Sequence, residues 1–466
     1  MSTIAQEFDR FVREWPAFGS TRAIDELRAR DFARLDANAH VYLDYTGAGL
    51  WSASQVQRHL DLLLGGVLGN PHSGNPASQR ATALVEQARR HVLAFFGASP
   101  DEYCVVFTGN ASQALKLVGE SYPFCPSGSF LLTFDNHNSV NGIREFARSR
   151  GAEITCIPAV PPDLRVDSAS VERALAAGAG PSPRLFAFPA QSNFSGVQHD
   201  LGWIAAAQAH GWDVLLDAAA FVPTNRLDLS RWHPDFVVLS FYKMFGHPTG
   251  VGALIARHAA LARLQRPWFA GGTITVASVG ADRHHLAAGA SAFEDGTLNF
   301  ANLPAVDIGL DFIEQVGLDR IHDRVQALTG WLLARLLSLR HSTGLPLLTV
   351  YGPADMRARG GTLALNFRDR SGAFIDHQTI EARAGARNIS IRSGCFCNPG
   401  AGELAMGISP DEMRACFVRL SDRITYDDFR RCIDGKSTGA VRVSLGLATN
   451  FADVHAFLEF TRGFLG

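Results

Sequence analysis

Short apolar runs alternate with amphipathic segments through the middle of the chain, from about residue 100 to residue 256. The runs are rich in Val, Leu, Ile and Phe and are bounded by turn-forming residues, which is typical of buried strands. Alternation of strands and helices predicts a mostly parallel sheet that is covered on both faces. We expect strands at 103–107, 129–134, 153–157, 185–188, 214–216, 236–240 and 252–255, and helices near 111–118, 139–150, 168–177 and 201–211.

The pattern changes on either side of this block. Apolar residues at helical spacing predict two short helices within 3–35, whereas 281–301 has the character of a loop. The remaining expected elements are a short strand at 41–44, helices at 54–65, 78–97, 304–316, 319–339, 409–417 and 453–461, and strands at 348–351, 361–367, 389–392 and 440–444. The predicted fold class is α/β, with a large ligand-binding domain at 37–315 and a smaller α+β domain made of 1–36 and 316–466.

Composition narrows the class of protein. A chain of 466 residues exceeds one ordinary core, and 47% hydrophobic with 19% charged residues fits a globular protein. A net charge of −2 gives no electrostatic case for binding nucleic acid or an anionic membrane. The first residues carry charges and lack the apolar core of a signal peptide, and no apolar run reaches the roughly 18 residues of a membrane span. Seven cysteines, odd in number and irregularly spaced, predict reduced thiols and a cytoplasmic protein.

Polar side chains follow the carboxyl ends of the predicted strands, where ligands bind in sheets of this kind. Asp217 ends one buried strand, and Lys243 follows the strand at 236–240 in a stretch that reads as strand, tight loop, strand. Taken alone, Lys243 fits a surface loop better than a binding site. Together, the two suit pyridoxal phosphate (PLP), because a carboxylate keeps the pyridine nitrogen protonated and a lysine binds the aldehyde.

Further candidates lie at other strand ends. Ala111 and Ser112 begin a predicted helix, where backbone N–H groups and a hydroxyl suit a phosphate, although Ser112 also fits an ordinary helix cap. His137 could stack on an aromatic cofactor or act as a catalytic proton relay; the alternative is an ordinary loop histidine. Asn193 could donate a hydrogen bond to the cofactor; the alternative is an ordinary turn asparagine. Thr297 offers a hydroxyl beside a Gly-rich turn, or lies in a surface loop.

A second stretch, from Arg392 to Gly400, holds two thiols, Cys395 and Cys397. One such pair supplies half of a zinc site and no matching second pair exists, so no metal is predicted. The loop favours exposure and Arg392 favours the thiolate, whereas the alternative is two inert structural cysteines. Arg442 lies in an apolar strand, where its guanidinium needs a carboxylate from an amino-acid substrate or from an internal salt bridge.

In this order, these pieces resemble the class V aminotransferase and cysteine-desulfurase-like family of PLP enzymes. Within it the chain is most similar to the desulfurase domain of molybdenum cofactor sulfurases. The resemblance runs from about residue 41 to residue 460. It rests on the stretches Tyr42-Leu43-Asp44, Gly69-Asn70-Pro71-His72-Ser73, Pro189-Ala190-Gln191-Ser192-Asn193-Phe194-Ser195-Gly196, Ser240-Phe241-Tyr242-Lys243, Phe293-Glu294-Asp295-Gly296-Thr297 and Arg392-Ser393-Gly394-Cys395-Phe396-Cys397-Asn398.

The resemblance implies PLP-dependent transferase fold type I, with residues 37–315 as the PLP-binding domain. It implies that Lys243 forms the Schiff base, that Asp217 pairs with the pyridinium, that His137 stacks on the ring and that Asn193 contacts the phenolic oxygen. The implied phosphate ligands are Ser112, Ser240 and Tyr242, together with Ala111, and Thr297 binds the phosphate in a second subunit. Cys397 is implied to form the persulfide, and Arg442 to bind the substrate carboxylate. It also implies a homodimer.

By this resemblance, the chain removes sulfur from L-cysteine or a related sulfur amino acid, forms alanine and passes the sulfur to an acceptor. Other class V reactions, those of an aminotransferase, a lyase or an epimerase, remain the alternative, as does a non-catalytic sulfur carrier.

The sequence departs from the family pattern in two places: Tyr242 and Ala220 stand where many desulfurases have His and Gln. We also expect the molybdenum-cofactor-binding domain of the eukaryotic enzymes to be absent, which leaves the acceptor open. The choice between Cys395 and Cys397 for the persulfide is open as well.

Overall fold

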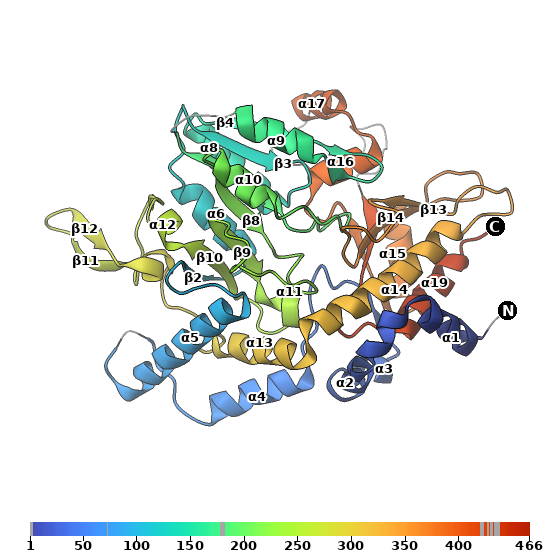
Figure 1. Cartoon of the computed structure of the whole chain (residues 1–466), viewed down its shortest axis with the longest axis horizontal. Coiled ribbons are helices and arrows are strands. Elements are labelled where there is room, and N and C mark those ends of the chain that lie inside the picture. Colours follow the sequence, from blue (N-terminus) through green and yellow to red (C-terminus); the bar gives the residue numbers. More distant parts are fainter. Residues whose placement is uncertain are drawn as a thin grey trace.

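The computed structural model describes residues 3–71, 73–177, 182–419, 424–425, 428, 432 and 439–466. His72, which belongs to one of the family-like stretches, lies outside the described residues. A large sheet with flanking helices lies beside a smaller sheet, and the long helix α14 (Leu318–Ser338) runs into the smaller part (Figure 1). No helix within the described ranges has the length and apolar content that crossing a membrane requires.

The large sheet has seven strands in the order β2-β10-β9-β8-β7-β3-β4. Only β10 runs antiparallel to its neighbours, so the expected mostly parallel sheet is confirmed. Each strand lies within about two residues of its predicted place. For the central strands β7 and β9 the reason is that a strand buried on both faces gives a compact apolar run. The bounds are β2 (Tyr103–Thr108), β3 (Ser129–Thr133), β4 (Glu153–Ile157), β7 (Arg184–Pro189), β8 (Asp213–Asp217), β9 (Phe236–Ser240) and β10 (Gly252–Arg257).

Alternate side chains of each strand enter two separate cores. Val105 and Phe107 join the core on one face, and Cys104 and Val106 join the core on the other. The first face is covered by α5 (Pro76–Phe95), α9 (Ser168–Ala177), α10 (Trp203–Ala209) and α13 (Pro304–Val316). The second is covered by α6 (Ala111–Ser121), α8 (Ile143–Ser149) and α12 (His258–Leu261). Burial of one such large side chain contributes about 1.5–3 kcal/mol, so the doubly covered sheet holds its strand ends rigidly.

The smaller sheet is antiparallel, with the order β13-β14-β17-β16. The predicted strand at 389–392 is split: β15 (Ile389–Ser390) pairs with β1 (Val41–Tyr42), and only the next residues join the smaller sheet. The chain after β1 therefore runs alongside Ser444 of β17. The other elements here are β13 (Leu348–Tyr351), β14 (Thr362–Phe367), β16 (Arg392–Gly394), β17 (Ala440–Ser444), α15 (His377–Gly385), α16 (Pro399–Met406), α17 (Pro410–Arg419) and α19 (Phe451–Arg462).

Two expectations about local structure were wrong. Part of the supposed loop at 281–301 belongs to a hairpin, β11 (Ile274–Ser278) with β12 (Arg283–Leu286), and a further part is the 3₁₀ helix η2 (Gly289–Phe293). The hairpin projects from the body of the molecule, and its strands lack a buried face, so they show no apolar alternation (Figure 1). The amino-terminal segment folds into α1 (Ile4–Glu14), η1 (Pro16–Thr21), α2 (Ala23–Asp31) and α3 (Ala33–Ala37) rather than two helices.

The expectation that all thiols are reduced was also wrong. Cys416 of α17 and Cys432 form a disulfide, with their Cα atoms 5.5 Å apart, whereas the other five cysteines are free thiols. That separation lies within the usual range for bridged cysteines. Irregular spacing along the sequence could not show that these two residues meet in space.

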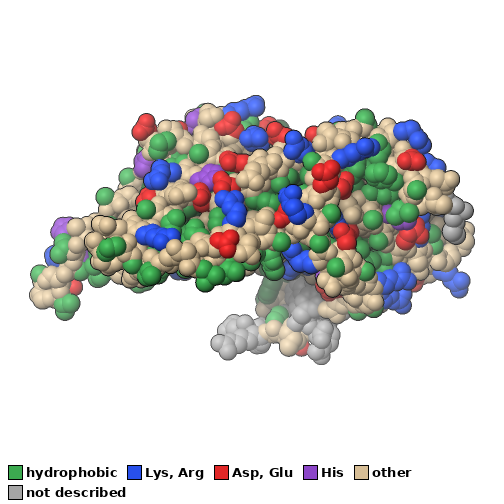
Figure 2. Space-filling model, turned by 90° about the horizontal axis from the view of Figure 1, so that it is seen from below, with side chains coloured by type: hydrophobic (Ala, Val, Ile, Leu, Met, Phe, Trp, Pro, Cys, Tyr) green, Lys and Arg blue, Asp and Glu red, His purple; other side chains and the backbone are tan. Residues whose placement is uncertain are grey.

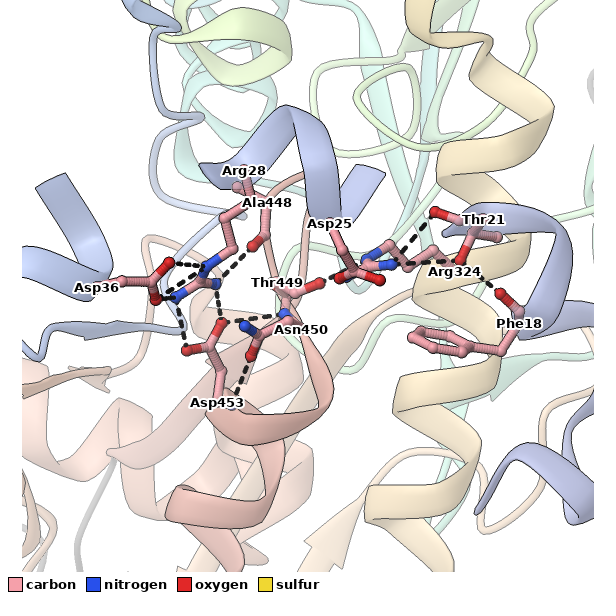
Figure 3. Close-up of polar contacts among 10 residues, drawn as sticks. All are labelled: Phe18, Thr21, Asp25, Arg28, Asp36, Arg324, Ala448, Thr449, Asn450 and Asp453. Atoms are coloured by element: carbon pink, nitrogen blue, oxygen red, sulfur yellow. Dashed lines mark hydrogen bonds and ion pairs between the residues drawn. The ribbon is translucent and has the colours of Figure 1, made fainter. Parts of the chain in front are cut away.

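Two buried arginines fasten the amino-terminal helices to the turn that precedes α19 (Figure 3). Arg28 of α2 forms ion pairs with Asp453 and Asp36 and donates to the Ala448 carbonyl. Arg324 of α14 pairs with Asp25 and donates to the Thr449 carbonyl. The two guanidinium groups therefore hold together segments from both ends of the chain.

We expect Arg28→Ala to lower the free energy of unfolding by about 3–5 kcal/mol, because it leaves the buried Asp453 carboxylate without its partner. Arg335 is the matched control, since its pair with Glu14 is partly exposed to solvent and Arg335→Ala should cost no more than about 1 kcal/mol. Urea unfolding followed by circular dichroism measures both. Equal losses in the two variants would contradict an anchoring role for Arg28.

Candidate active site

A cavity of about 220 Å³ lies at the carboxyl ends of the central strands. Most of the candidate residues line it, although they come from segments far apart in the sequence. The lining includes Ala111, Ser112, His137, Asn193, Asp217, Ser240, Tyr242 and Lys243, and also Gln191 and Ala220. The strand order explains this convergence, because β9, β8 and β7 are neighbours and end at the same edge.

Lys243 lies in a single helical turn, α11 (Phe241–Phe245), where the sequence pattern indicated a tight loop. The turn follows β9 directly and ends at Gly246, whose φ of 78° favours glycine. A Cβ atom on Gly246 would also lie 2.2 Å from the Trp51 amide nitrogen. The lysine segment is thus clamped between the sheet and the turn around Gly49, whose N–H donates to the Tyr242 carbonyl.

The Lys243 amine lies in an enclosed and charged environment. Burial lowers its pKa from the usual lysine value, and the positive charges of Arg442 and Arg392 act in the same direction. Asp217 opposes this shift by raising the pKa of Lys243. The net lowering of the pKa makes the neutral amine more accessible than in an exposed lysine, and this is the form that reacts with a carbonyl group or accepts a proton.

The start of α6 forms one end of the cavity. The Ser240 hydroxyl accepts a hydrogen bond from the Ala111 N–H at 2.9 Å, and the Ser112 and Ser139 hydroxyls lie 2.6 Å apart. Asn110 caps the helix by accepting from the Gln113 N–H. Three hydroxyl groups therefore surround the positive end of a helix dipole, an arrangement that suits a phosphate.

His137 is held in one orientation at the cavity wall. Its Nδ1 accepts a hydrogen bond from the Ser139 N–H at 3.1 Å, so the neutral ring carries its proton on Nε2. Burial lowers the pKa of His137, and the nearby Lys243 and Arg442 charges lower it further, against the opposing effect of Asp217. The ring is therefore an uncharged flat surface with one N–H donor.

Asp44, to which the sequence assigned no role, joins Arg442 and Arg392. Arg442 Nη2 donates to Asp44 Oδ1 at 2.9 Å, and Arg392 Nη2 donates to Asp44 Oδ2 at 2.7 Å. Arg442 also donates to the Asn193 carbonyl at 3.1 Å, and its buried Nε has no hydrogen-bond partner among the described residues. Two positive charges face one carboxylate, so one positive charge is left over beside the cavity.

The loop with the two thiols lies next to this pair of arginines. Cys397 is exposed and lies close enough to Lys243, Arg392 and Arg442 to interact with each of them electrostatically. Cys395 is half-buried. The Asn138 N–H donates to the Cys397 carbonyl at 2.7 Å, so the backbone of Cys397 lies next to the segment of His137, which lines the cavity.

Thr297, unlike the other phosphate-binding candidates, does not line the cavity. It lines a separate pocket with Gly109 and Lys116, and Asn70 Nδ2 lies 3.4 Å from its hydroxyl. The resemblance gives this residue a role in a second subunit, which a single chain does not display.

Comparison with known proteins identifies the family. Residues 41–457 match the family model described as Aminotransferase class-V. The chain belongs to this family. It is a PLP-dependent enzyme of fold type I, as its sheet and cavity also indicate.

Among curated relatives, the chain is 39% identical over 460 residues to a protein of Bos taurus named molybdenum cofactor sulfurase, covering 94% of this chain and 51% of the relative. It is 36% identical to a protein of the same name from Solanum lycopersicum, covering 98% of this chain and 59% of the relative. The chain thus spans between half and three-fifths of the length of these relatives.

Two solved structures share the fold. A cysteine desulfurase from Thermococcus onnurineus NA1 superposes with a TM-score of 0.76 at 23% identity, covering 95% of this chain and 98% of that one. The cysteine desulfurase CsdA from Escherichia coli gives a TM-score of 0.73 at 20% identity, covering 95% of this chain and 99% of that one.

The cavity fits PLP by the chemistry of its donors. The α6 start suits the phosphate, Asp217 lies at the end of β8 with a carboxylate to pair with the pyridine nitrogen, and Lys243 presents its amine. Gln191 reaches the wall beside Ala220, where its Nε2 donates to the Ala220 carbonyl at 2.9 Å. The Gln191 side chain thus supplies an amide next to Ala220, the position at which many desulfurases have a glutamine.

We expect the Lys243 amine of the cofactor-free protein to react with acetic anhydride at lower pH than the exposed Lys116, because its pKa is lowered. Asp217→Asn should move the Lys243 midpoint further down, since the Asp217 carboxylate raises that pKa. Mass spectrometry of peptides across a pH series gives both midpoints, and Lys116 serves as the internal control. A Lys243 midpoint at or above that of Lys116 would contradict the electrostatics described above.

Proposed function

We propose that this protein is a PLP-dependent cysteine desulfurase, which takes sulfur from L-cysteine and carries it as a persulfide on Cys397. The single observation that supports this most is the place of Cys397, exposed at the edge of the cavity and within electrostatic range of Lys243 and Arg442. An aminotransferase or an epimerase of the same fold has no need for a thiol there. The names of the relatives suggest molybdenum cofactor as the acceptor of the sulfur.

Charge balance around Arg442 supports an amino-acid substrate. Asp44 neutralises one of the two guanidinium charges, and the carboxylate of L-cysteine supplies the second negative charge. The unpartnered Nε of Arg442 is a further donor in this region. A carboxylate bound here places the substrate between Lys243 and the cysteine loop.

Lys243 transfers the substrate proton, and His137 supports the cofactor ring. The lowered pKa of Lys243 favours its neutral amine, which takes the proton from Cα of the substrate and later returns one. His137 stays neutral because its pKa is lowered, so it lies against the cofactor ring without adding charge. The cofactor, when bound, supplies the sink for the electrons released at Cα.

The sulfur then moves to Cys397. Its thiolate attacks the substrate sulfur, so that a new S–S bond forms while the bond between Cβ and that sulfur breaks. The electron pair of the broken bond stays with the carbon skeleton, which gains protons at Cα and Cβ and leaves as alanine. Cysteine and the enzyme thiol thus become alanine and the enzyme persulfide, and no outside oxidant or reductant is needed.

We expect Cys397→Ser to abolish alanine formation from L-cysteine while the absorbance of bound PLP is retained, because only the sulfur-accepting group is lost. Cys395→Ser is the matched control in the same loop and should keep the activity. Alanine is measured by amino-acid analysis, and the persulfide by mass spectrometry of the peptide that holds both thiols. The proposal fails if Cys397→Ser forms alanine and sulfide at the rate of the parent enzyme, or if cysteine yields a keto acid instead.

Replacing Arg442 by Lys should raise KM for L-cysteine about 10- to 100-fold, which corresponds to a charge-assisted hydrogen bond of about 1.5–3 kcal/mol. The forked guanidinium contacts Asp44 and Asn193 together, and a single ammonium group cannot reproduce this. Steady-state kinetics with cysteine measures the change. An unchanged KM would remove the assignment of Arg442 to the substrate carboxylate.

We further propose a homodimer. One face of α4 (Ala53–Leu64) and the following turn exposes a row of apolar side chains at helical spacing, namely Val56, Leu60, Leu63, Leu64 and Val67. The hairpin is exposed as well, with Val276, Val279 and Leu286 on it, and it projects at the left of Figure 2 with green apolar side chains along it. A second copy of the chain would cover these apolar surfaces. Thr297 would then face the phosphate end of the other subunit's cavity.

Leu60→Glu combined with Leu64→Glu should shift the protein from dimer to monomer, since it places two charges in the proposed apolar interface. Sedimentation velocity measures the mass. Leu345→Glu is the control, because Leu345 is similarly exposed and lies in the loop before β13. A monomeric parent protein, or a dimer in the double variant, would contradict this interface.

A cytoplasmic location is also part of the proposal. Cys397 is an exposed free thiol, and such thiols stay reduced in a compartment that keeps glutathione and thioredoxin active. The Cys416–Cys432 disulfide is the exception among the seven cysteines.

A further inference from the structure

The backbone around Cys397 is tied down on both sides. The Asn138 N–H donates to the Cys397 carbonyl at 2.7 Å, and Asn193 Nδ2 donates to the Phe396 carbonyl at 2.7 Å. The Phe396 side chain is buried, with its ring 5.3 Å from that of Phe194 and 4.8 Å from the Arg442 guanidinium carbon. An exposed thiol therefore stands on a backbone that is fixed to the wall of the cavity.

Asn398 connects these ties, and its side chain is fully buried. Its Nδ2 donates to the Asp135 carbonyl at 2.6 Å and to Asn193 Oδ1 at 2.9 Å, while its Oδ1 accepts from the Ala401 N–H at the start of α16. One amide thus joins the cysteine loop, the segment before His137 and the side chain of Asn193. All of its donors and one acceptor position are used, so it has one orientation.

The side-chain amide of Asn193 has two roles. One N–H of Nδ2 is used by the Phe396 carbonyl, and Oδ1 is used by Asn398, which leaves the second N–H for the cavity that Asn193 lines. The group assigned to the cofactor oxygen is therefore the same group that holds the cysteine loop. A change in the orientation of this amide alters both contacts at once.

The loop conformation requires such ties. Phe396 and Cys397 have φ values of 54° and 55°, in the left-handed region that costs about 1–3 kcal/mol for a residue other than glycine. Next to them Gly400 approaches the end of β3 so closely that a Cβ atom would lie 2.0 Å from the Phe134 carbonyl oxygen. Without the hydrogen bonds, the loop would relax to an unstrained backbone and Cys397 would leave the cavity edge.

We infer that Asn398 is a positioning residue for sulfur transfer, which holds Cys397 over the substrate and couples the cysteine loop to the cofactor through Asn193. This inference rests on the proposed desulfurase function. Because the loop is fixed, the persulfide forms and remains at the mouth of the cavity, and the sulfur acceptor must bind there. Asn398 acts after the substrate is bound, because the substrate carboxylate is held by Arg442 and not by the loop.

The test uses the holoenzyme and Asn398→Asp. The aspartate keeps an oxygen for the Ala401 N–H but cannot donate to Asp135 or Asn193, so it removes the ties and preserves the helix cap. We expect kcat for alanine formation to fall about 10- to 100-fold, with KM for cysteine changed less than about 3-fold, because the thiol is misplaced and the substrate is not. Asn398→Ser, which is small and uncharged, should show the same division between kcat and KM.

Two further measurements separate positioning from loss of structure. Hydrogen exchange of the 393–402 peptide should accelerate at least 10-fold in both variants, and single-turnover mass spectrometry should show slower persulfide formation on Cys397. Asn450→Ala is the control, since it removes the cap of α19 and lowers the melting temperature without touching the cysteine loop. It should leave kcat and the loop exchange unchanged.

The outcomes are distinguishable. A parent enzyme that forms no persulfide from cysteine overturns the proposed function itself. A parent that forms it, with Asn398→Asp equally fast, or with kcat losses as large in Asn450→Ala, overturns the positioning role of Asn398 and leaves the desulfurase intact.

Discussion

The ion pairs between Asp44, Arg392 and Arg442 are the interaction on which the rest of the site depends. They join the chain after β1 to β16 and β17 of the smaller sheet, at the place where the large sheet ends. Ser444 extends the same junction, because its N–H donates to the Leu43 carbonyl and its hydroxyl accepts from the Thr46 N–H. The same bonds orient Arg442, which also donates to the carbonyl of the cavity residue Asn193 and is thereby held beside the cavity.

A second consequence of this junction is electrostatic. Burial is the main cause that lowers the pKa of Lys243 and that of His137; the positive charge of Arg442 acts in the same direction, and Asp217 opposes both shifts. Polar groups in an enclosed site interact strongly, so the acidity of the lysine is set by residues of three separate chain segments. This explains why the catalytic behaviour expected of Lys243 could not be judged from its own stretch of sequence.

Much of the fold was predictable because its strands are buried on both faces. The strand at 236–240, for example, is buried along its whole length and has the predicted bounds, since an apolar run between turn residues leaves few alternatives. The β11–β12 hairpin was missed because neither of its faces is buried in one chain, so it lacks the pattern that reveals a strand. The helical turn at Lys243 was missed because five residues are too few to show a helical period.

The site was predictable in part. Parallel strands deliver their last residues to one edge, so Asp217, Asn193 and Lys243 meet there without any further information. Asp44 and Asn398 could not be assigned from the sequence, because their partners come from distant segments that only tertiary packing brings near. The disulfide of Cys416 and Cys432 escaped prediction for another reason: the spacing of seven cysteines along the chain does not show which two meet in space.

The exposed position of Cys397 has a chemical cost for an enzyme that hands sulfur to a partner. A thiolate that an acceptor can reach is also open to peroxide, which converts it first to a sulfenic acid and then to sulfinic and sulfonic acids that ordinary thiols do not reduce. Because hydrogen bonds fix the surrounding backbone, the sulfur atom cannot move to a buried position and stays exposed to solvent. The lifetime of such an enzyme in the cell is therefore governed by how long this one sulfur atom remains occupied or reduced.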